Sequence, residues 1–311
     1  MGLMVAMKIL SEKTKILLKQ EFPIIENSII KLYRGSGISK EEVEFYQKHI
    51  NVVRQISCFL STSIQKNVSE GFLQTTNLPL KALFEYELMV STNPPFTFLG
   101  TNELDKYGEK EVLIHSGAII QITNINENPK NNFNIHGKIF STGWKGYFQY
   151  VAMNTDLNEL NLKDNHFGNG KIETMQFIKE AIIANKGIKE LVLSNNSFGN
   201  GKIEIMDLLK DSLIANESIK VLNLNNNCFG DGEIGNMQLL KEAIAKNKSR
   251  KLLYLFDNGF ASAKKENMQL LKEALMENNS IEELDLGWNK FDAEEKNDFN
   301  KLFGEKMKLL I

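Results

Sequence analysis

The pattern of apolar and polar positions changes near residue 157, and from there to the C-terminus it repeats every 31 residues. Each repeat contains a Leu-x-Leu pair, then an asparagine, and then a phenylalanine two residues further on. The leucine pairs are Leu160 and Leu162, Leu191 and Leu193, Leu222 and Leu224, Leu253 and Leu255, and Leu284 and Leu286. The asparagines are Asn165, Asn196, Asn227, Asn258 and Asn289, and the phenylalanines are Phe167, Phe198, Phe229, Phe260 and Phe291. Amphipathic stretches containing Met175, Met206, Met237 and Met268 separate the pairs, so each unit is expected to contain a short strand, a turn and a helix.

This unit resembles the leucine-rich repeat, in its ribonuclease-inhibitor type with a helix on the convex side. The resemblance implies a solenoid of five units over residues 153–311, in which the leucine pairs form the core and each asparagine bonds the backbone of neighbouring turns. A final helix ending at Leu309, Leu310 and Ile311 is expected to cap the stack. Glycine-rich segments such as Gly168 to Lys171 recur with the repeat, which favours turns over phosphate-binding loops.

Two repeats place unusual side chains at strand positions that should face solvent. The predicted partner-binding residues are Leu252, Tyr254 and Phe256 of the fourth unit and Glu282 and Asp285 of the fifth, with Glu283 between them. An apolar patch beside acidic residues is typical of a surface that binds a protein. The alternative is that Arg250, at a position where leucine is expected, distorts the fourth unit and buries its aromatic residues.

The N-terminal half shows several short apolar segments without a period. Residues 5 to 32 predict two short helices separated at Pro23. Leu32 to Gly37 predicts a strand that brings Arg34 to a glycine-rich turn, where an arginine suits a phosphate or carboxylate ligand, although a surface arginine is the alternative. Glu41 to Ile50 predicts a helix, and Phe84 to Val90 another strand.

Two further segments carry polar groups at strand ends. Cys58 to Ser63 predicts a strand ending in three hydroxyls, which could bind a sugar or orient a carboxylate, or could cap a helix beginning near Asn67. In Gly108 to Ile122, Glu109 and Glu111 stand at the start of an apolar strand. Side chains two residues apart in a strand share a face, so we expect these carboxylates to be neighbours while Lys110 points away.

Composition excludes some classes of protein. The 311 residues have 42% apolar content, and 37 Lys+Arg nearly balance 39 Asp+Glu, which gives no basic excess for nucleic acid. No apolar run is long enough for a membrane span, and Met1 to Leu10 does not resemble a secretory signal. Cys58 and Cys228 fall in different predicted domains, so both are expected to be buried and unpaired in a reducing compartment. The four histidines have no metal-ligand spacing, and we predict no metal.

The order of these motifs, Tyr33-Arg34-Gly35, then Phe59 to Ser63, then Glu109 to Ile114, resembles the arginine, serine, glutamate class of mono-ADP-ribosyltransferases over about Leu32 to Tyr150. The resemblance implies a split two-sheet α/β fold in residues 1–152 that uses NAD as substrate. Because Glu109 is a glutamate where other members have glutamine, it also implies transfer to arginine. Ser116 and Gly117 stand where many relatives have prolines.

The resemblance also assigns roles to individual residues. Glu111 would stabilise the positive charge that develops on the ribose, and Ser61 would orient Glu111. Arg34, Gly35, Ser61, Thr62, Ser63 and Phe72 would bind NAD. Glu109 and Tyr107 would bind the acceptor guanidinium. A core aromatic remains the alternative for Phe72, and a surface tyrosine for Tyr107.

The sequence therefore predicts an NAD-dependent protein-arginine ADP-ribosyltransferase followed by a repeat domain that recruits the protein substrate. We expect a monomer in the cytoplasm, and a bacterial effector delivered to a host cytosol is a hypothesis by analogy. Two alternatives remain: an NAD glycohydrolase, which transfers to water, and a leucine-rich repeat binding module with an inactive NAD fold.

Overall fold

The computed structural model describes residues 29–56, 60–89, 96–98, 109–128, 132–140, 142–261 and 265–311. The two helices predicted over residues 5 to 32 lie outside these ranges up to residue 28, and from Ile29 onward the prediction is wrong, because β1 (Ile29–Ile38) begins there. The chain divides into two compact units after Tyr147, within helix α4 (Gly143–Met153), whereas the sequence analysis placed the boundary after residue 152. None of the helices in these ranges is both long and apolar enough to cross a membrane.

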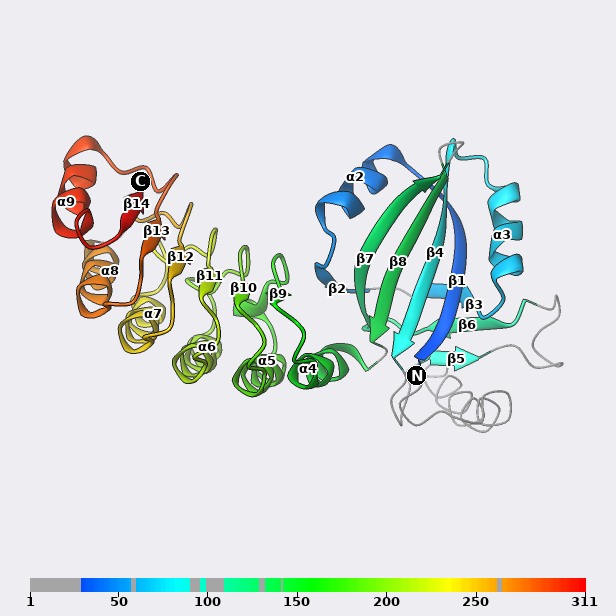
Figure 1. Cartoon of the computed structure of the whole chain (residues 1–311), viewed down its shortest axis with the longest axis horizontal. Coiled ribbons are helices and arrows are strands. Elements are labelled where there is room, and N and C mark those ends of the chain that lie inside the picture. The colour runs from blue at the N-terminus through cyan, green and yellow to red at the C-terminus, as the bar shows by residue number, and fades with distance from the viewer. Residues whose placement is uncertain are drawn as a thin grey trace. The chain divides into compact units, whose positions relative to one another are not determined.

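The N-terminal unit is a mixed α/β fold whose described strands have the order β2-β7-β8-β4-β1-β3-β6-β5 (Figure 1). The strands are β1 (Ile29–Ile38), β2 (Val53–Gln55), β3 (Leu60–Ser63), β4 (Leu80–Met89), β5 (Phe96–Phe98), β6 (Glu111–Ile114), β7 (Ile119–Asn128) and β8 (Asn132–Phe140). The described helices of this unit before α4 are α2 (Lys40–Lys48) and α3 (Lys66–Thr75). The predicted strand at Phe84 and the predicted helix at Glu41 are confirmed, and β4 begins earlier, at Leu80.

The eight strands form two groups that are joined at one point. β1 pairs with β4 along its whole length, but it pairs with β3 only at Tyr33 and Ser63. Figure 1 shows the short strands β3, β6 and β5 running across the direction of the long strands β1, β4, β8 and β7. The side chains of β1, β4 and β8 alternate, so that Leu32, Ala82, Leu88, Ile135 and Ile139 are buried in one core.

Strand β1 continues through its two glycines, and the glycine-rich turn predicted after Arg34 is wrong. Gly35 pairs with Leu83 and Gly37 with Lys81 in the β1–β4 ladder. The glycines are needed for packing, because a Cβ atom at Gly35 would lie 1.9 Å from the backbone oxygen of Ser69 in α3. The absence of a side chain therefore allows α3 to lie directly on the strand that carries Arg34.

The C-terminal unit is a parallel six-stranded sheet with one α-helix between successive strands (Figure 1). Its strands are β9 (Glu159–Asn161), β10 (Glu190–Val192), β11 (Val221–Asn223), β12 (Leu252–Tyr254), β13 (Glu283–Asp285) and β14 (Lys308–Leu310). Its helices after α4 are the 3-10 helix η1 (Phe167–Asn169), α5 (Ile172–Ala184), α6 (Ile203–Ala215), α7 (Ile234–Lys246), α8 (Lys265–Glu277) and α9 (Ala293–Phe303). Every leucine of the five pairs and every recurring phenylalanine is buried, as the period predicts.

Two columns of asparagine connect neighbouring repeats. In the first, Asn227 Oδ1 accepts hydrogen bonds from the backbone N–H groups of Asn196 at 3.0 Å and Phe198 at 3.3 Å, and Nδ2 donates to the carbonyl of Leu193 at 3.0 Å. The second column follows the helices and consists of Asn185, Asn216, Asn247 and Asn278. Asn216, for example, donates to the carbonyls of Ile182 and Asn185. The sequence analysis missed this second column, although it has the same period.

The fourth repeat is regular, so the predicted alternative of a distorted unit is wrong. β12 pairs in register with both β11 and β13. The Arg250 side chain is 3% exposed, and its guanidinium donates to the carbonyls of Ile219 at 2.8 Å and Leu213 at 3.3 Å. Burial lowers the pKa of Arg250 to about 10. These two carbonyls therefore provide hydrogen-bond partners for the guanidinium, so the fourth repeat can hold an arginine where a leucine was expected.

Two other expectations need correction. The last residues do not end a helix: α9 ends at Phe303, and β14 extends the parallel sheet by pairing with β13. Cys228 is free and exposed rather than buried, because it lies in the turn after β11 with a φ of 60° and its side chain points out of the repeat core. Cys58 lies outside the described residues.

The turns after the strands contain one further repeating feature. The residue before each recurring asparagine has a positive φ: Asp164, Asn195, Asn226 and Asp257 in the first four units, and Trp288 (58°) in the fifth. Asparagine and aspartate tolerate this conformation, whereas a bulky residue in it costs on the order of 1–3 kcal/mol. Trp288 is nevertheless 76% exposed, so burial does not offset that cost.

The packing of α3 on β1 makes a prediction about two glycines. Gly35→Ala should displace α3 and lower the free energy of unfolding of the N-terminal unit by about 2 kcal/mol or more, because the new Cβ would overlap a backbone atom. Gly71→Ala is the matched control, since no atom lies within 4 Å of its Cβ position and alanine favours a helix by about 0.5–1 kcal/mol. Urea denaturation measures both changes, and equal stability of the two variants would contradict the packing argument.

The asparagine column makes a prediction for the repeat unit. Asn227→Ala should lower the free energy of unfolding by about 3 kcal/mol or more, because it leaves several buried backbone groups without partners, each costing about 1–3 kcal/mol. Asn200→Ala, at an exposed turn position of the repeat unit, should change stability by about 0.5 kcal/mol or less. Chemical denaturation followed by circular dichroism would show the difference, and a similar small effect of both changes would refute it.

Candidate functional site

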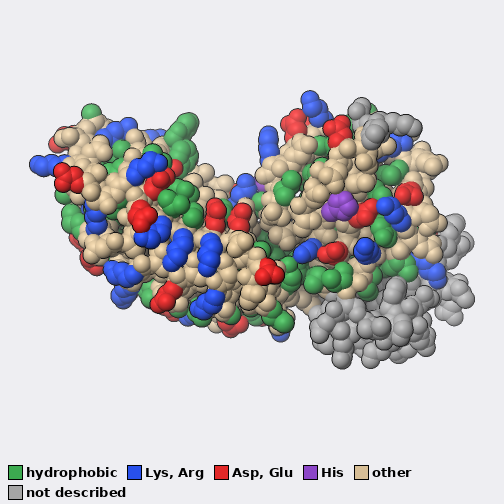
Figure 2. Space-filling view, in the orientation of Figure 1, with side chains coloured by type: hydrophobic (Ala, Val, Ile, Leu, Met, Phe, Trp, Pro, Cys, Tyr) green, Lys and Arg blue, Asp and Glu red, His purple; other side chains and the backbone are tan. Residues whose placement is uncertain are grey.

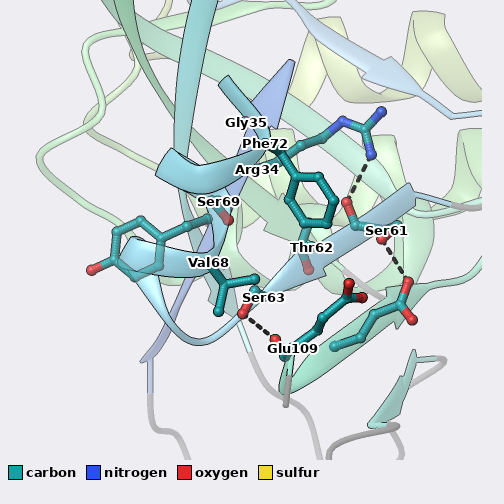
Figure 3. Close-up of a pocket in the computed structure, with 11 residues that line it drawn as sticks. Arg34, Gly35, Ser61, Thr62, Ser63, Val68, Ser69, Phe72 and Glu109 are labelled. Carbon is teal, nitrogen blue, oxygen red and sulfur yellow. Dashed lines mark hydrogen bonds between the residues drawn. The ribbon is translucent and has the colours of Figure 1, made fainter. Parts of the chain in front are cut away.

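A cavity of about 210 Å³ lies where β1, β3, α3 and the start of β6 come together (Figure 3). Its lining residues are Tyr33, Arg34, Gly35, Ser61, Thr62, Ser63, Val68, Ser69, Phe72, Glu109 and Glu111. The three sequence motifs, which are separated by up to 77 residues along the chain, therefore meet at one place. Of the residues predicted for the catalytic and NAD-binding roles, all line this cavity. Tyr107 lies outside the described residues.

The centre of the site is a hydrogen bond between two strands. Ser61 Oγ on β3 donates to Glu111 Oε1 on β6 at 2.6 Å. Arg34 Nη1 on β1 donates to the backbone carbonyl of the same Ser61 at 2.9 Å. Figure 3 shows both bonds along one wall of the cavity. These contacts orient the Glu111 carboxylate and the Arg34 guanidinium, so both charged groups are held by the backbone or hydroxyl of one residue.

The sequence analysis expected the two glutamates to lie on one continuous strand, but they do not. β6 begins at Glu111, and Lys110 has a φ of 46°. The backbone there is held by β3 and the residue after it, since Ser63 Oγ donates to the Glu109 carbonyl at 2.5 Å and Ile64 N–H donates to the Lys110 carbonyl at 3.3 Å. The turn at Lys110 replaces strand alternation as the reason why Glu109 and Glu111 both line the cavity.

The three hydroxyls of β3 have different surroundings. Ser61 is exposed, while Thr62 and Ser63 are buried. Thr62 Oγ1 donates to the Val112 carbonyl at 2.8 Å, which joins β3 to β6. Ser63 Oγ donates to Glu109 and also accepts from Gln65 N–H at 3.0 Å, just before α3, although the N-cap residue of α3 is Gln65 itself. The hydroxyls of Thr62 and Ser63 thus bind backbone carbonyls in the wall of the cavity. That these two residues contact NAD stays a prediction.

Helix α3 supplies the aromatic wall of the cavity. Phe72 is 46% exposed, and Figure 3 shows its ring facing the cavity beside Arg34 and Ser61. This exposure excludes the alternative that Phe72 is a core aromatic. The sequence analysis missed Val68, Ser69 and Tyr33 as lining residues. The spacing of Val68 and Phe72, four residues apart on one helix, was the signal that could have found Val68.

The other Glu-x-Glu pairs have different environments. Glu42 completes the capping box of α2 with Ser39, and Glu44 lies 4.0 Å from Lys40. Glu85 forms an ion pair with Lys66 at 2.7 Å. Glu85 and Glu87 line a separate cavity of about 410 Å³ on the face of β1, β4 and β8. Among the described residues, Glu109 and Glu111 are thus the Glu-x-Glu pair that shares a cavity with an arginine and a serine.

The arrangement suits a ligand with separate charged and aromatic parts. Two carboxylates lie at one side of the cavity, where they would favour positive charge on a bound molecule. Arg34 offers a fork of donors for phosphate or hydroxyl oxygens, and the Phe72 ring can pack on a planar group. No group of three potential metal ligands occurs in the part of the chain that the structure describes.

Comparison with known proteins finds two kinds of similarity. Residues 215–232 and 277–294 match the leucine-rich repeat family model. A leucine-rich repeat-containing protein, LegL7 from Legionella pneumophila, is 19% identical, with 52% of this chain and 49% of LegL7 covered and a TM-score of 0.41. By sequence, the chain matches no curated protein.

Other similar solved structures are ADP-ribosyltransferases. Vis, a toxin from Vibrio splendidus solved in complex with agmatine, is 21% identical, with 39% of this chain and 54% of Vis covered and a TM-score of 0.28. An ADP-ribosyltransferase from Clostridium botulinum is 19% identical, with 40% of this chain and 67% of the clostridial protein covered and a TM-score of 0.27. The chain spans about half the length of Vis. It is similar in part to ADP-ribosyltransferases and in part to leucine-rich repeat proteins.

Proposed function

We propose that this protein transfers ADP-ribose from NAD to an arginine side chain of a protein substrate. The observation that carries the proposal is the Ser61–Glu111 hydrogen bond inside a cavity that also contains Arg34, Phe72 and Glu109. A carboxylate fixed by a hydroxyl is what stabilisation of a developing ribose cation requires. The cationic, aromatic and acidic groups match the different parts of NAD and of a guanidinium acceptor.

The size of the cavity supports binding of one end of NAD. Ligand sites for molecules of this class usually occupy roughly 300–1,000 Å³, so a cavity of about 210 Å³ would hold the nicotinamide and its ribose rather than the whole dinucleotide. Phe72 would pack on the nicotinamide ring, and the Gly35 backbone would bind its amide. Arg34 would hold the phosphate or adjoining ribose oxygens.

Glu111 acts where the bond breaks. Nicotinamide leaves as a neutral molecule when its bond to the ribose carbon is cleaved, and it takes the bonding electron pair with it, so no general acid is needed. The ribose carbon then carries positive charge. The Glu111 carboxylate, held by Ser61 at 2.6 Å, stabilises that charge through a hydrogen bond to the ribose 2′-hydroxyl.

Glu109 acts on the acceptor. An arginine guanidinium remains protonated at neutral pH, and a carboxylate can hold two of its N–H groups. Glu109 would place one guanidinium nitrogen beside the ribose carbon. The new carbon–nitrogen bond forms there, and that nitrogen loses one proton. Although Lys110 turns the backbone between the two glutamates, both Glu109 and Glu111 line the cavity.

Labelled NAD separates this activity from its two alternatives. Incubation with agmatine, a small guanidinium compound, should give an ADP-ribosylated adduct and free nicotinamide. Release of nicotinamide without an adduct would favour NAD hydrolysis. The absence of release would favour a binding module with an inactive NAD fold.

The site of action is also part of the proposal. Cys228 is a free, exposed thiol, which suits a reducing compartment such as the cytosol. A bacterial effector that acts in a host cytosol would agree with a catalytic unit joined to an interaction repeat.

The recruitment of a protein substrate is a second part of the proposal. Leu252, Tyr254 and Asp285 are partly exposed in the sheet of the repeat unit. Phe256 is partly exposed in the turn after β12, and Glu282 is exposed just before β13. This exposure supports a role in binding the protein that is modified.

The different roles of the glutamates predict different failures. Glu111→Gln should lower both agmatine modification and NAD hydrolysis by roughly 10²-fold or more, because it removes the charge that stabilises the ribose cation. Glu109→Gln should abolish arginine transfer while slow nicotinamide release to water continues. Radiolabelled NAD turnover with and without agmatine measures both activities.

Glu87→Gln is the matched control, because Glu87 lines the other cavity. It should retain activity, and all three variants should unfold within about 0.5 kcal/mol of the wild type. Loss of hydrolysis in Glu109→Gln, or full activity of Glu111→Gln, would show that the roles are wrongly assigned.

Recruitment by the repeats predicts a selective kinetic effect. Tyr254→Ala with Phe256→Ala should raise KM for the protein substrate by about tenfold or more, while agmatine modification stays nearly unchanged. Steady-state kinetics with lysate-purified substrate and with agmatine test this. An equal loss on both acceptors would argue against recruitment and would indicate a folding defect.

A further inference from the structure

Strand β12 and the turns that follow β12 and β13 carry an exposed aromatic surface. We call Tyr254, Phe256 and Trp288 the aromatic face. Tyr254 and Phe256 are partly exposed, and Trp288 is among the most exposed large apolar residues in the described part of the chain. In Figure 2, hydrophobic side chains lie next to both acidic and basic side chains over the C-terminal strands of the repeat unit.

The aromatic face is organised by contacts within it. The Phe256 ring lies against Gly287, since a Cβ atom there would be 3.1 Å from Phe256 Cδ2. The Phe256 and Trp288 rings have centroids 5.8 Å apart and are tilted by 33°. Gly287 leaves space for the Phe256 ring, and the Phe256 ring packs against the Trp288 ring. The tryptophan is therefore held in place although most of its surface is in contact with solvent.

Comparison among the repeats shows that Trp288 is not needed for the repeat itself. The equivalent positions are Asp164, Asn195, Asn226 and Asp257, whose side chains suit the positive φ that all five residues share. Tryptophan is unfavourable in that conformation and gains little burial there. Its presence at a strained, exposed position indicates a function outside the fold.

The charged groups that act on Tyr254 are three acidic residues, Glu283, Glu190 and Asp285, and one basic residue, Lys308. Asp285 lies beside Tyr254 in the sheet, and its Oδ1 accepts from the N–H of Gly287 at 2.8 Å, next to Trp288. Glu283 lies two residues before Asp285 on β13 and forms an ion pair with Lys308 at 2.9 Å. Burial raises the pKa of the Tyr254 phenol, and Glu283, Glu190 and Asp285 raise it further, against an opposing effect of Lys308. Neither Asp285 nor Glu190 has an ion-pair partner among the described residues.

We propose that the aromatic face binds a flexible cationic segment of a partner protein, with an arginine or lysine side chain packed on Trp288 and its charge near Asp285. A guanidinium or ammonium group is attracted to the face of an indole ring, and a neighbouring carboxylate adds to that attraction. Charge complementarity selects this occupant, because an acidic or purely apolar segment would meet Asp285 and Glu190 without compensation. The binding is independent of catalysis, so it stands or falls separately from the transferase activity.

Intrinsic fluorescence can locate the binding. The chain contains two tryptophans, and Trp144→Phe leaves Trp288 as the reporter. The full-length variant is titrated with a short synthetic peptide of arginine, lysine, leucine and serine, and with its counterpart in which glutamate replaces the basic residues. The cationic peptide should shift the emission of Trp288 and protect it from acrylamide quenching, and added salt should weaken the binding. The acidic peptide should do neither.

Calorimetry with variants tests the residues. Trp288→Asn restores the residue type of the other repeats, so its melting temperature should equal or exceed that of the wild type, while the Kd for the cationic peptide rises at least about tenfold. Asp285→Asn should weaken binding and reduce its salt dependence. Leu302→Gln, at an exposed position on α9, is the control and should leave Kd unchanged.

Four results would overturn the proposal. The first is that the cationic peptide does not bind, and the second is that it binds equally well to the wild type and to a folded Trp288→Asn variant. The third is that the wild type self-associates in analytical ultracentrifugation and Trp288→Asn does not, which would make a second copy of the chain the occupant. Equal binding of both peptides would also contradict the role of charge.

Discussion

The repeat unit depends on the need to satisfy backbone groups that its turns bury. A buried N–H or C=O group without a partner costs about 1–3 kcal/mol, and each turn of the solenoid buries several. Asn196, Asn227 and Asn258 bond the turns that follow the strands, and Asn185, Asn216 and Asn247 bond those that follow the helices. Because these contacts recur in each repeat, the buried asparagines hold the backbone of the repeat unit in place. The exposed strand and turn positions can then vary, as Tyr254 and Trp288 do.

The N-terminal unit follows a different principle, in which a few long-range contacts place the functional groups. Gly35 lets α3 approach β1, and this brings Phe72 to the same cavity as Arg34. The backbone bonds from Ser63 and Ile64 hold the turn at Lys110, which directs Glu109 and Glu111 to that cavity. Neighbouring residues therefore hold the charged side chains of the cavity in position. The Ser61–Glu111 hydrogen bond connects β3 to β6 at its centre.

The success of the sequence analysis depended on how local each feature is. The buried leucines and phenylalanines of the repeats were predictable, since a period of 31 residues identifies positions with the same environment. The residues of the cavity were found from motifs and a family resemblance. The local backbone was predicted less well. Gly35 was expected to form a turn but instead lets α3 pack on β1, and Glu109 lies before β6 because the backbone turns at Lys110. Both errors concern contacts with segments far away in the sequence, which spacing alone does not reveal.

The C-terminal strand shows the same limit. A strand of three residues, such as β14, has too few alternating positions to differ from the end of a helix in sequence, and only its pairing with β13 defines it. Trp288 is the opposite case, because its signal was present in the sequence. It breaks a column of asparagine and aspartate, and comparison of equivalent positions would have found it without a structure.

The location of the arginines has a consequence for the protein's own fate. The sequence contains three arginines, Arg34, Arg54 and Arg250, among 37 basic residues. Arg34 lines the cavity, Arg54 lies 4.9 Å above the Phe45 ring with its Nε buried, and Arg250 is enclosed in the repeat core. The exposed basic residues are lysines, which the proposed chemistry does not use. If the protein transfers ADP-ribose to arginine as proposed, a copy of it offers few accessible guanidinium groups to other copies, and self-modification would be limited even at high concentration.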